Sequence, residues 1–186
     1  EEPTILSAIV CAYLQGRKEV KLEGLPIGSA FPLRKIEADA LQYVIGHQIG
    51  HGQPEDLLAC MKYHHKEYKE AEILWERALK KRPKDVGLLR NLAVVSYSHT
   101  DKDGRKRASV LLEQARLADP HSEQLLWEAA YVALRNGYVP ETVLEWFRET
   151  DPVSIRDDIM IEWVRALNMA DRSEEALDLM EEHRFI

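Results

Sequence analysis

The sequence has few cysteines, no long apolar run and no excess of positive charge, and each shortage excludes a class of protein. Its two cysteines, Cys11 and Cys60, lie far apart in apolar helical context and do not indicate a disulfide framework. No apolar run approaches the roughly 20 residues that a membrane-spanning helix needs. The formal charge of -7 opposes nucleic-acid binding, because phosphate contacts need a concentrated positive field. We therefore expect no nucleic-acid or membrane partner, and a reducing, cytoplasmic environment.

Motifs of catalysis and cofactor binding are also missing. The chain has no glycine-rich phosphate loop, no serine or cysteine nucleophile motif and no convincing carboxylate pair, so we expect neither an enzyme nor a cofactor. His47, His51, His64 and His65 raise the question of a metal site, but the Gly-His-Gln-Ile-Gly-His-Gly run favours a solvated loop. The Asp101-Lys-Asp-Gly stretch resembles the start of a calcium loop but lacks its later glutamate, which favours an ordinary turn.

The length of 186 residues suits either one sizeable core or a short array of small units, and it does not choose between them. The chain starts without methionine and without the basic-then-apolar order of a signal peptide. We therefore expect it to be a segment of a longer protein.

An internal repeat is the strongest positive signal. Ala71, Trp75, Ala78 and Pro83 are spaced by four, three and five residues, and the same spacing returns at Ala108, Leu112, Ala115 and Pro120. A weaker third copy has Thr142 and Trp146, and a fourth has Ala176 and Met180. The later copies follow one another at intervals of 34 residues, the length of a known helical repeat.

A second register lies upstream of the first. It consists of the pairs Leu58-Ala59, Leu92-Ala93, Ala129-Ala130 and Trp163-Val164, which are again 34 residues apart except for one step of 37. Both registers gain three residues between Leu92 and Ala108. The shared gain predicts an insertion in the turn from His99 to Gly104.

This double register resembles the tetratricopeptide repeat (TPR). That repeat has a large and a small apolar residue in its first helix, then alanine, an aromatic, alanine and proline in and after its second. The resemblance implies an all-α fold, a right-handed α-α superhelix (TPR-like solenoid) of about four helix pairs. Two positions depart from the pattern. Lys62 occupies a position where an aromatic is usual, with Tyr63 one residue later, and Glu149 replaces the small residue of the second helix in the third repeat.

The repeat pattern predicts one continuous solenoid. Residues 1–53 are expected to form a degenerate helix pair, with helices at Thr4 to Gly16 and Arg34 to Ile45. The long connection from Arg17 to Leu33 is expected to pack on the array or on a neighbouring domain. Three repeats follow at 54–85, 86–122 and 123–186, the last of which includes a final helix pair from about residue 156. Pro54, Asp85, Gly137 and Pro140 stand where helices should start or stop.

Solenoids of this kind usually bind other proteins along the groove that their first helices line. The resemblance implies these groove candidates: Tyr63, His64, Arg90, Asn91, Tyr97, Trp127, Tyr131, Arg135, Arg165 and Asn168. Tyrosine, tryptophan and arginine are common interface anchors, although an aromatic at helical spacing can equally belong to the core. We therefore predict a protein-interaction scaffold that binds a peptide or a neighbouring domain.

The variant of the repeat that grips a terminal carboxylate needs lysine and asparagine at fixed groove positions. Those positions hold Asp56, Cys60, Gln124 and Glu128, and only Asn91 matches. We do not expect this binding mode.

Two stretches, Leu57 to Ala93 and Ser154 to Ile186, resemble a narrower group. The Arg-Asp-Asp start and the closing Glu-Glu-His-Arg-Phe are similar to the TPR region of bacterial proteins of uncharacterised function that also carry galactose-mutarotase-like β-sandwich domains. The Trp-Glu-Gly-Gly-Glu-Gly-like continuation of that family is absent. This resemblance implies an alternative function, a structural connecting module of a larger bacterial carbohydrate-related protein, with no ligand of its own and with other domains of the same polypeptide as partners.

Overall fold

The computed structural model describes residues 4–26, 32, 34–98 and 102–183. Throughout this part of the chain, regular secondary structure is exclusively helical. The helices are α1 (Ile5–Leu14), α2 (Lys35–Gly46), α3 (Gln53–His64), α4 (Tyr68–Lys81), α5 (Val86–Ser98), α6 (Lys102–Ala118), α7 (Glu123–Arg135), α8 (Pro140–Leu144), η1 (Glu145–Phe147, a 3-10 helix), α9 (Asp157–Met169) and α10 (Ser173–Glu182). The all-α fold is therefore confirmed. Among these residues no helix is both long and apolar enough to cross a bilayer.

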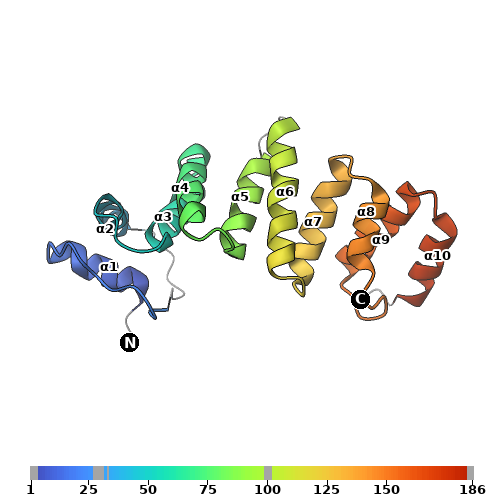
Figure 1. The fold of residues 1–186 in the computed structure, drawn as a ribbon, viewed down its shortest axis with the longest axis horizontal. Helices are drawn as coiled ribbons and strands as arrows, with labels where there is room; N and C mark the ends of the chain where they lie inside the picture. Colours follow the sequence, from blue (N-terminus) through green and yellow to red (C-terminus); the bar gives the residue numbers. More distant parts are fainter. Residues whose placement is uncertain (1–3, 27–31, 33, 99–101, 184–186) are drawn as a thin grey trace. The chain divides into compact units, whose positions relative to one another are not determined.

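The chain forms two compact units, the N-unit (Glu1–Val95) and the C-unit (Ser96–Ile186). In the N-unit, α2 packs against α1 and α3, and α4 lies beside α3 (Figure 1). In the C-unit, α6 packs on α7, and α9 contacts α7, α8 and α10. In each unit, the helices named here therefore bury their apolar sides against helices that are near them in the chain.

The helix boundaries follow the local signals of the sequence. Pro54 lies in the first turn of α3, and Pro140 is the first residue of α8. The Asp85 carboxylate accepts a hydrogen bond from the Leu88 backbone N–H at 3.0 Å and so caps α5. Gly137, with φ of 77°, follows the end of α7 in the left-handed conformation. All four predicted boundary residues stand at helix ends.

The connection between α1 and α2 packs on its own unit where it is described. Leu22 is 5% exposed and joins the core of α1, α2 and α3, with Val20 and Leu25 against the same cluster. The Ile5 N–H donates a hydrogen bond to the Pro26 carbonyl at 3.0 Å. Residues 27–31 and 33 of this connection lie outside the described residues.

The three-residue insertion before Ala108 lengthens a helix, which corrects the prediction of an ordinary turn at this place. Residues 99–101 lie outside the described part, but Lys102 to Gly104 form the first turn of α6. As a result α6 has 17 residues, whereas α4, the corresponding helix of the preceding repeat, has 14. Asp103 in this first turn interacts favourably with the positive end of the helix dipole, which helps the extra turn to stay helical.

The third copy of the repeat is buried one residue later than its sequence pattern predicts. Thr142 is exposed and Trp146 half-buried, whereas Val143 and Phe147 are both 0% exposed. Val143 and Phe147 are four residues apart, as Thr142 and Trp146 are, and both belong to the core of the C-unit, so the inward face of α8 and η1 as a whole is displaced by one residue from the predicted register. In α10, Ala176 is buried as predicted, but Leu179 is buried instead of Met180.

Gly52 is required by both its backbone conformation and its surroundings. It has φ of 92°, and a Cβ placed on it would lie 3.1 Å from the Ala78 carbonyl oxygen of α4. We expect Gly52→Ala to lower the free energy of unfolding by about 2 kcal/mol, from left-handed strain and displacement of α4. Gly24→Ala is the matched control, because Gly24 also has positive φ but open space around it. Urea unfolding should show the larger loss for Gly52→Ala; equal losses would mean that the contact with α4 is unimportant.

His183 fastens the end of α10 to the segment before α9. Its side chain is 1% exposed, and its ring nitrogens lie 2.8 Å from the Pro152 carbonyl oxygen and 2.8 Å from the Asp157 carboxylate. Because both partners are acceptors, only the doubly protonated imidazolium can donate to both. The hydrogen bond to Asp157, followed by that to Pro152, raises the pKa of His183 above its ordinary 6.5.

This raised pKa predicts a pH-dependent stability. The contribution of His183 is complete below pH 6.5, its ordinary value, and is lost as pH rises through the higher pKa of the folded state. We expect the melting temperature of the wild type, relative to that of His183→Gln, to fall as the pH is raised above 6.5 and through the higher pKa of the folded state. Melting curves at closely spaced pH values would measure this difference. A difference that stays constant with pH would contradict the imidazolium assignment.

Candidate functional site

An open hollow in the N-unit brings together four of the predicted groove residues. Its volume is about 560 Å³, and its lining comes from α3, the α3–α4 turn, α4 and α5. The lining residues are Cys60, Tyr63, His64, Lys66, Tyr68, Trp75, Arg90, Asn91 and Val94. The predicted Tyr63, His64, Arg90 and Asn91 thus share one surface. Their binding role stays a prediction.

Aromatic rings form the floor of this hollow. The Tyr63 ring centroid lies 5.6 Å from that of Trp75 and 5.2 Å from that of Tyr68. Trp75 is 3% exposed, and its indole N–H donates to the Asp56 carboxylate at 2.9 Å. The other oxygen of Asp56 accepts a hydrogen bond from Arg82 at 3.1 Å. The floor is therefore held from below and is fixed before any ligand arrives.

Asp56 is committed to this support. Burial raises the pKa of its carboxyl, and the hydrogen bonds from Arg82 and Trp75 oppose the rise. Burial, followed by the charge of Asp56, raises the pKa of the Cys60 thiol to about 11, so that Cys60 is neutral at physiological pH. Neither residue can supply the cation that a carboxylate-gripping site would need at these two positions, consistent with the exclusion of that binding mode.

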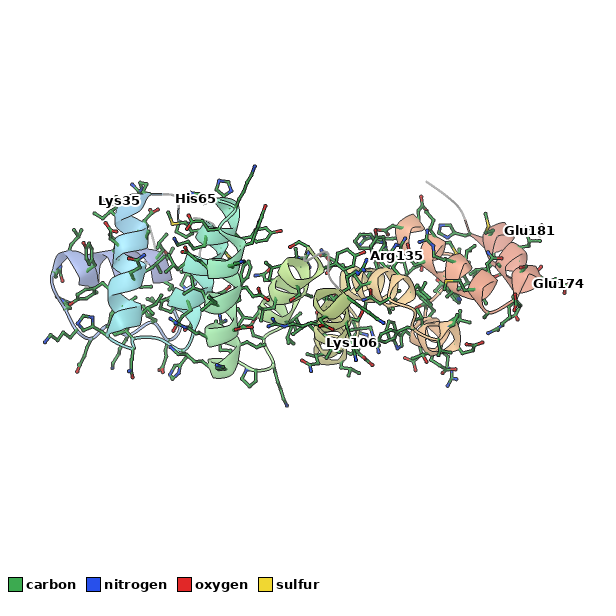
Figure 2. All side chains as sticks on the ribbon, turned by 90° about the horizontal axis from the view of Figure 1, so that it is seen from above. Lys35, His65, Lys106, Arg135, Glu174 and Glu181 are labelled. Atoms are coloured by element: carbon green, nitrogen blue, oxygen red, sulfur yellow. The ribbon has the colours of Figure 1, made fainter. Side chains whose placement is uncertain are left out.

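Four polar groups of the lining have no partner within the described structure. The Lys66 ammonium, the Asn91 side-chain amide and the hydroxyls of Tyr63 and Tyr68 form no hydrogen bond or ion pair with any residue that the structure describes. Lys66 follows the exposed pair of His64 and His65 at the end of α3, and Figure 2 labels His65 there. These groups are available to a ligand.

A second group of predicted residues gathers in the C-unit. The Tyr131 ring lies 5.6 Å from Trp127 and 6.4 Å from Tyr97, and all three side chains are half-buried. Pairs of rings at such separations and inclinations attract one another. The three rings, which we call the aromatic row, form a continuous and partly exposed apolar surface.

Arg135 closes one end of the aromatic row, and it is already bound. Its guanidinium lies 3.4 Å from the Tyr131 ring centroid and donates to both oxygens of Glu162, at 3.0 and 3.3 Å. Glu162 is 3% exposed and also lies 3.7 Å from Arg165. Figure 2 labels Arg135 at the end of α7. These contacts connect α7 with α9, so that both arginines already have an intramolecular partner.

Asn168, the last predicted groove residue, is engaged in the turn between α9 and α10. Its amide donates to the Val164 carbonyl at 3.0 Å and accepts from the Ser173 hydroxyl at 3.0 Å. The hollow also contains residues that sequence reasoning missed, namely Lys66 and Tyr68. They belong to a turn and to the start of a second helix, where the repeat pattern gives no sign of a groove position.

Apart from the adjacent rings of His64 and His65, with centroids 5.7 Å apart, the candidate histidines have separate environments. His47 lies 2.8 Å from the Tyr43 carbonyl oxygen, His51 lies 3.9 Å from Glu23, and His65 lies 3.8 Å from Glu67. Within the described ranges, no group of three or more His, Cys, Asp or Glu side chains is placed to hold a metal ion.

Comparison with known proteins shows the fold. The chain matches no protein-family model and no curated protein. Among solved structures it is similar to YrrB, described as "a TPR protein with an unusual peptide-binding site", with 16% identity over 78% of this chain and 74% of YrrB at a TM-score of 0.63. It is also similar to MamA AMB-1, with 14% identity over 96% of this chain and 87% of that protein at a TM-score of 0.64. The similarity to MamA MSR-1 has 12% identity over 96% of this chain and 91% of that protein at a TM-score of 0.58. The chain therefore has a TPR-like helical-repeat fold, as predicted.

Proposed function

We propose that this chain is a protein-interaction scaffold that binds a peptide or a segment of a neighbouring domain in the N-unit hollow. The observation that carries the proposal is the combination of a fixed aromatic floor with donors that have no partner in the described structure. Binding sites usually combine apolar area with a few directed polar groups. The similarity to YrrB, a peptide-binding protein of the same fold, supports the proposal.

The aromatic row of the C-unit is a second candidate surface. Its three rings offer apolar area, and the Arg135 guanidinium lies over the Tyr131 ring at 3.4 Å from its centroid. Trp and Tyr are typical anchors of protein interfaces, because each combines a large ring with a polar group. On this proposal, the aromatic row binds a peptide segment independently of the hollow.

Selection from a random dodecapeptide display library tests the proposal. Peptides selected on the wild type should bind at least about tenfold more weakly to Tyr68→Ala and to Asn91→Ala, since each removes a group at the centre of the contact. Ile73→Ala is the matched control, because Ile73 is an exposed residue of α4 outside the hollow. Failure to select any peptide, or equal binding by all three folded variants, would overturn the proposal for the hollow. The variant Tyr97→Ala/Trp127→Ala/Tyr131→Ala tests the aromatic row in the same assay.

A connecting module without its own ligand is the second candidate function. It is favoured by exposed apolar side chains on α10, where Leu177 is 63% and Met180 44% exposed on one face of the helix. A β-sandwich domain of the kind found in the resembling bacterial proteins would cover this face. Hydrogen exchange of α10 in this chain and in a longer version of the protein tests this candidate. Equal exchange rates would argue against it.

A further inference from the structure

The hollow of the N-unit differs in charge from the chain that contains it. The whole chain has 32 acidic and 25 basic residues, for a formal charge of -7. The ionisable side chains that line the hollow include Lys66, Arg90 and His64, and no carboxylate is found among the described lining residues. The hollow is therefore a locally basic site on an acidic protein, and the local field attracts negative groups.

The hydrogen-bonding character of the lining agrees with its charge. Lys66 and the guanidinium of Arg90 are donors only, and the hydroxyls of Tyr63 and Tyr68 can each donate one bond. The Cys60 thiol stays protonated and adds no negative charge. Carboxylates are acceptor-only groups and form stronger hydrogen bonds with such donors than neutral acceptors do. The lining therefore favours a ligand that is rich in carboxylates.

The ligand must also have an apolar side chain. Tyr68 is 41% and Val94 40% exposed at the hollow, and burying them releases water from apolar surface. Resting on the proposed function, we infer that the N-unit hollow selects peptide segments in which an apolar side chain is flanked by aspartate or glutamate. The apolar side chain lies on the aromatic floor, and the flanking carboxylates accept hydrogen bonds from Lys66 and the tyrosine hydroxyls.

A single-stranded nucleic acid shares the negative charge but fits the site less well. Base stacking on successive bases needs several exposed aromatic faces, and although Tyr68 is 41% exposed, Trp75, the largest ring at the hollow, is only 3% exposed. The net charge of -7 also repels a long polyanion. A peptide with a short acidic stretch meets less of this repulsion, and so it is the occupant that the charges favour.

Three display libraries of dodecapeptides test the inference. They share a randomised apolar centre and differ only in their flanks, which are Asp/Glu, Lys/Arg or Ser/Gly. We expect the acidic library to yield the strongest binders, and their affinity to fall with added salt because the contacts are ionic. A fluorescent oligothymidylate serves as the nucleic-acid probe.

Charge variants connect the binding to Lys66. Lys66→Glu should lower the affinity for the selected acidic peptides about tenfold or more, and Lys66→Arg should keep most of that affinity. Lys80→Glu is the matched control. It makes the same change of net charge at the far end of α4, about 18 Å along the helix from Tyr68, which is beyond the screening length of about 8 Å. Melting curves verify that each variant is folded.

The outcomes separate the inference from the proposed function. If neutral or basic peptides bind best and still depend on Tyr68 and Asn91, the inference is overturned while the scaffold function stands. If no library binds, the proposed function fails. If Lys80→Glu weakens the acidic peptides as much as Lys66→Glu, the attraction comes from net charge and the inference is again overturned. Tight binding of the oligonucleotide at the hollow would assign the site to nucleic acid instead.

Discussion

Phe147→Ala should lower the free energy of unfolding of the C-unit by about 4 kcal/mol, the range found when a fully buried aromatic ring is removed. Phe147 is 0% exposed, and its ring stacks on Trp163 at 5.3 Å between centroids with an interplanar angle of 7°. Truncation removes this stacking and leaves a cavity among residues of α7, α9 and α10. Urea unfolding followed by circular dichroism measures the loss.

Trp146→Ala is the informative control, because the repeat pattern predicts Trp146 and not Phe147 as the core aromatic. Trp146 is half-buried, and Arg116 lies over its ring at 4.7 Å. Losing part of its burial and this cation–π contact should cost about 1–2 kcal/mol. A larger loss for Trp146→Ala than for Phe147→Ala would mean that the sequence register is right and the inward position of Phe147 is wrong.

Arg135→Met should lower the free energy of unfolding by about 3 kcal/mol, because it leaves the buried Glu162 carboxylate without its main partner. Glu162 is 3% exposed and receives two hydrogen bonds from Arg135. Arg165 is a weaker partner at 3.7 Å, with a side chain that is 41% exposed. Arg165→Met is therefore expected to cost less than about 1 kcal/mol, as for exposed ion pairs in general.

A double variant distinguishes a lost attraction from a stranded charge. Arg135→Met/Glu162→Met replaces the pair by apolar side chains of similar length, and such replacements are often neutral or stabilising. We expect the double variant to be more stable than Arg135→Met alone when both are unfolded in urea. If the changes in the free energy of unfolding caused by Arg135→Met and by Glu162→Met simply add in the double variant, the single variant Arg135→Met does not suffer from an unpaired buried carboxylate. Its loss of stability then comes from the contact with Tyr131.

The comparison of Arg135 with Lys66 shows what sequence reasoning about a binding surface can miss. Arg135 stands at a groove position of the repeat, and arginine is a common interface anchor. In the structure its guanidinium is already bound by Glu162, which lies 27 residues away in the chain. Lys66 stands outside the groove pattern, and in the structure it lines the hollow. Sequence spacing specifies which face of a helix a residue occupies, but not which charges from other helices meet it.

The interpretation of the turns has a similar limit. The two registers correctly located the three extra residues before Ala108, but they could not indicate whether these residues form a turn or extend a helix. A turn and one more helical turn accommodate three residues equally well, and the choice depends on how the start of α6 packs. The same holds for the third repeat, where packing against the other helices of the C-unit places Phe147 in the core instead of Trp146.

The sequence by itself determined the all-α class, the repeat of about 34 residues and most helix ends. These depend on local chemistry, namely the spacing of small and large apolar residues, capping side chains, proline and glycine. Tertiary structure alone decided which aromatics are buried, which arginines are bound and which donors line the N-unit hollow. The physical reason is that these properties depend on distances between side chains of different helices, and small changes of helix length or register alter those distances without altering the repeat.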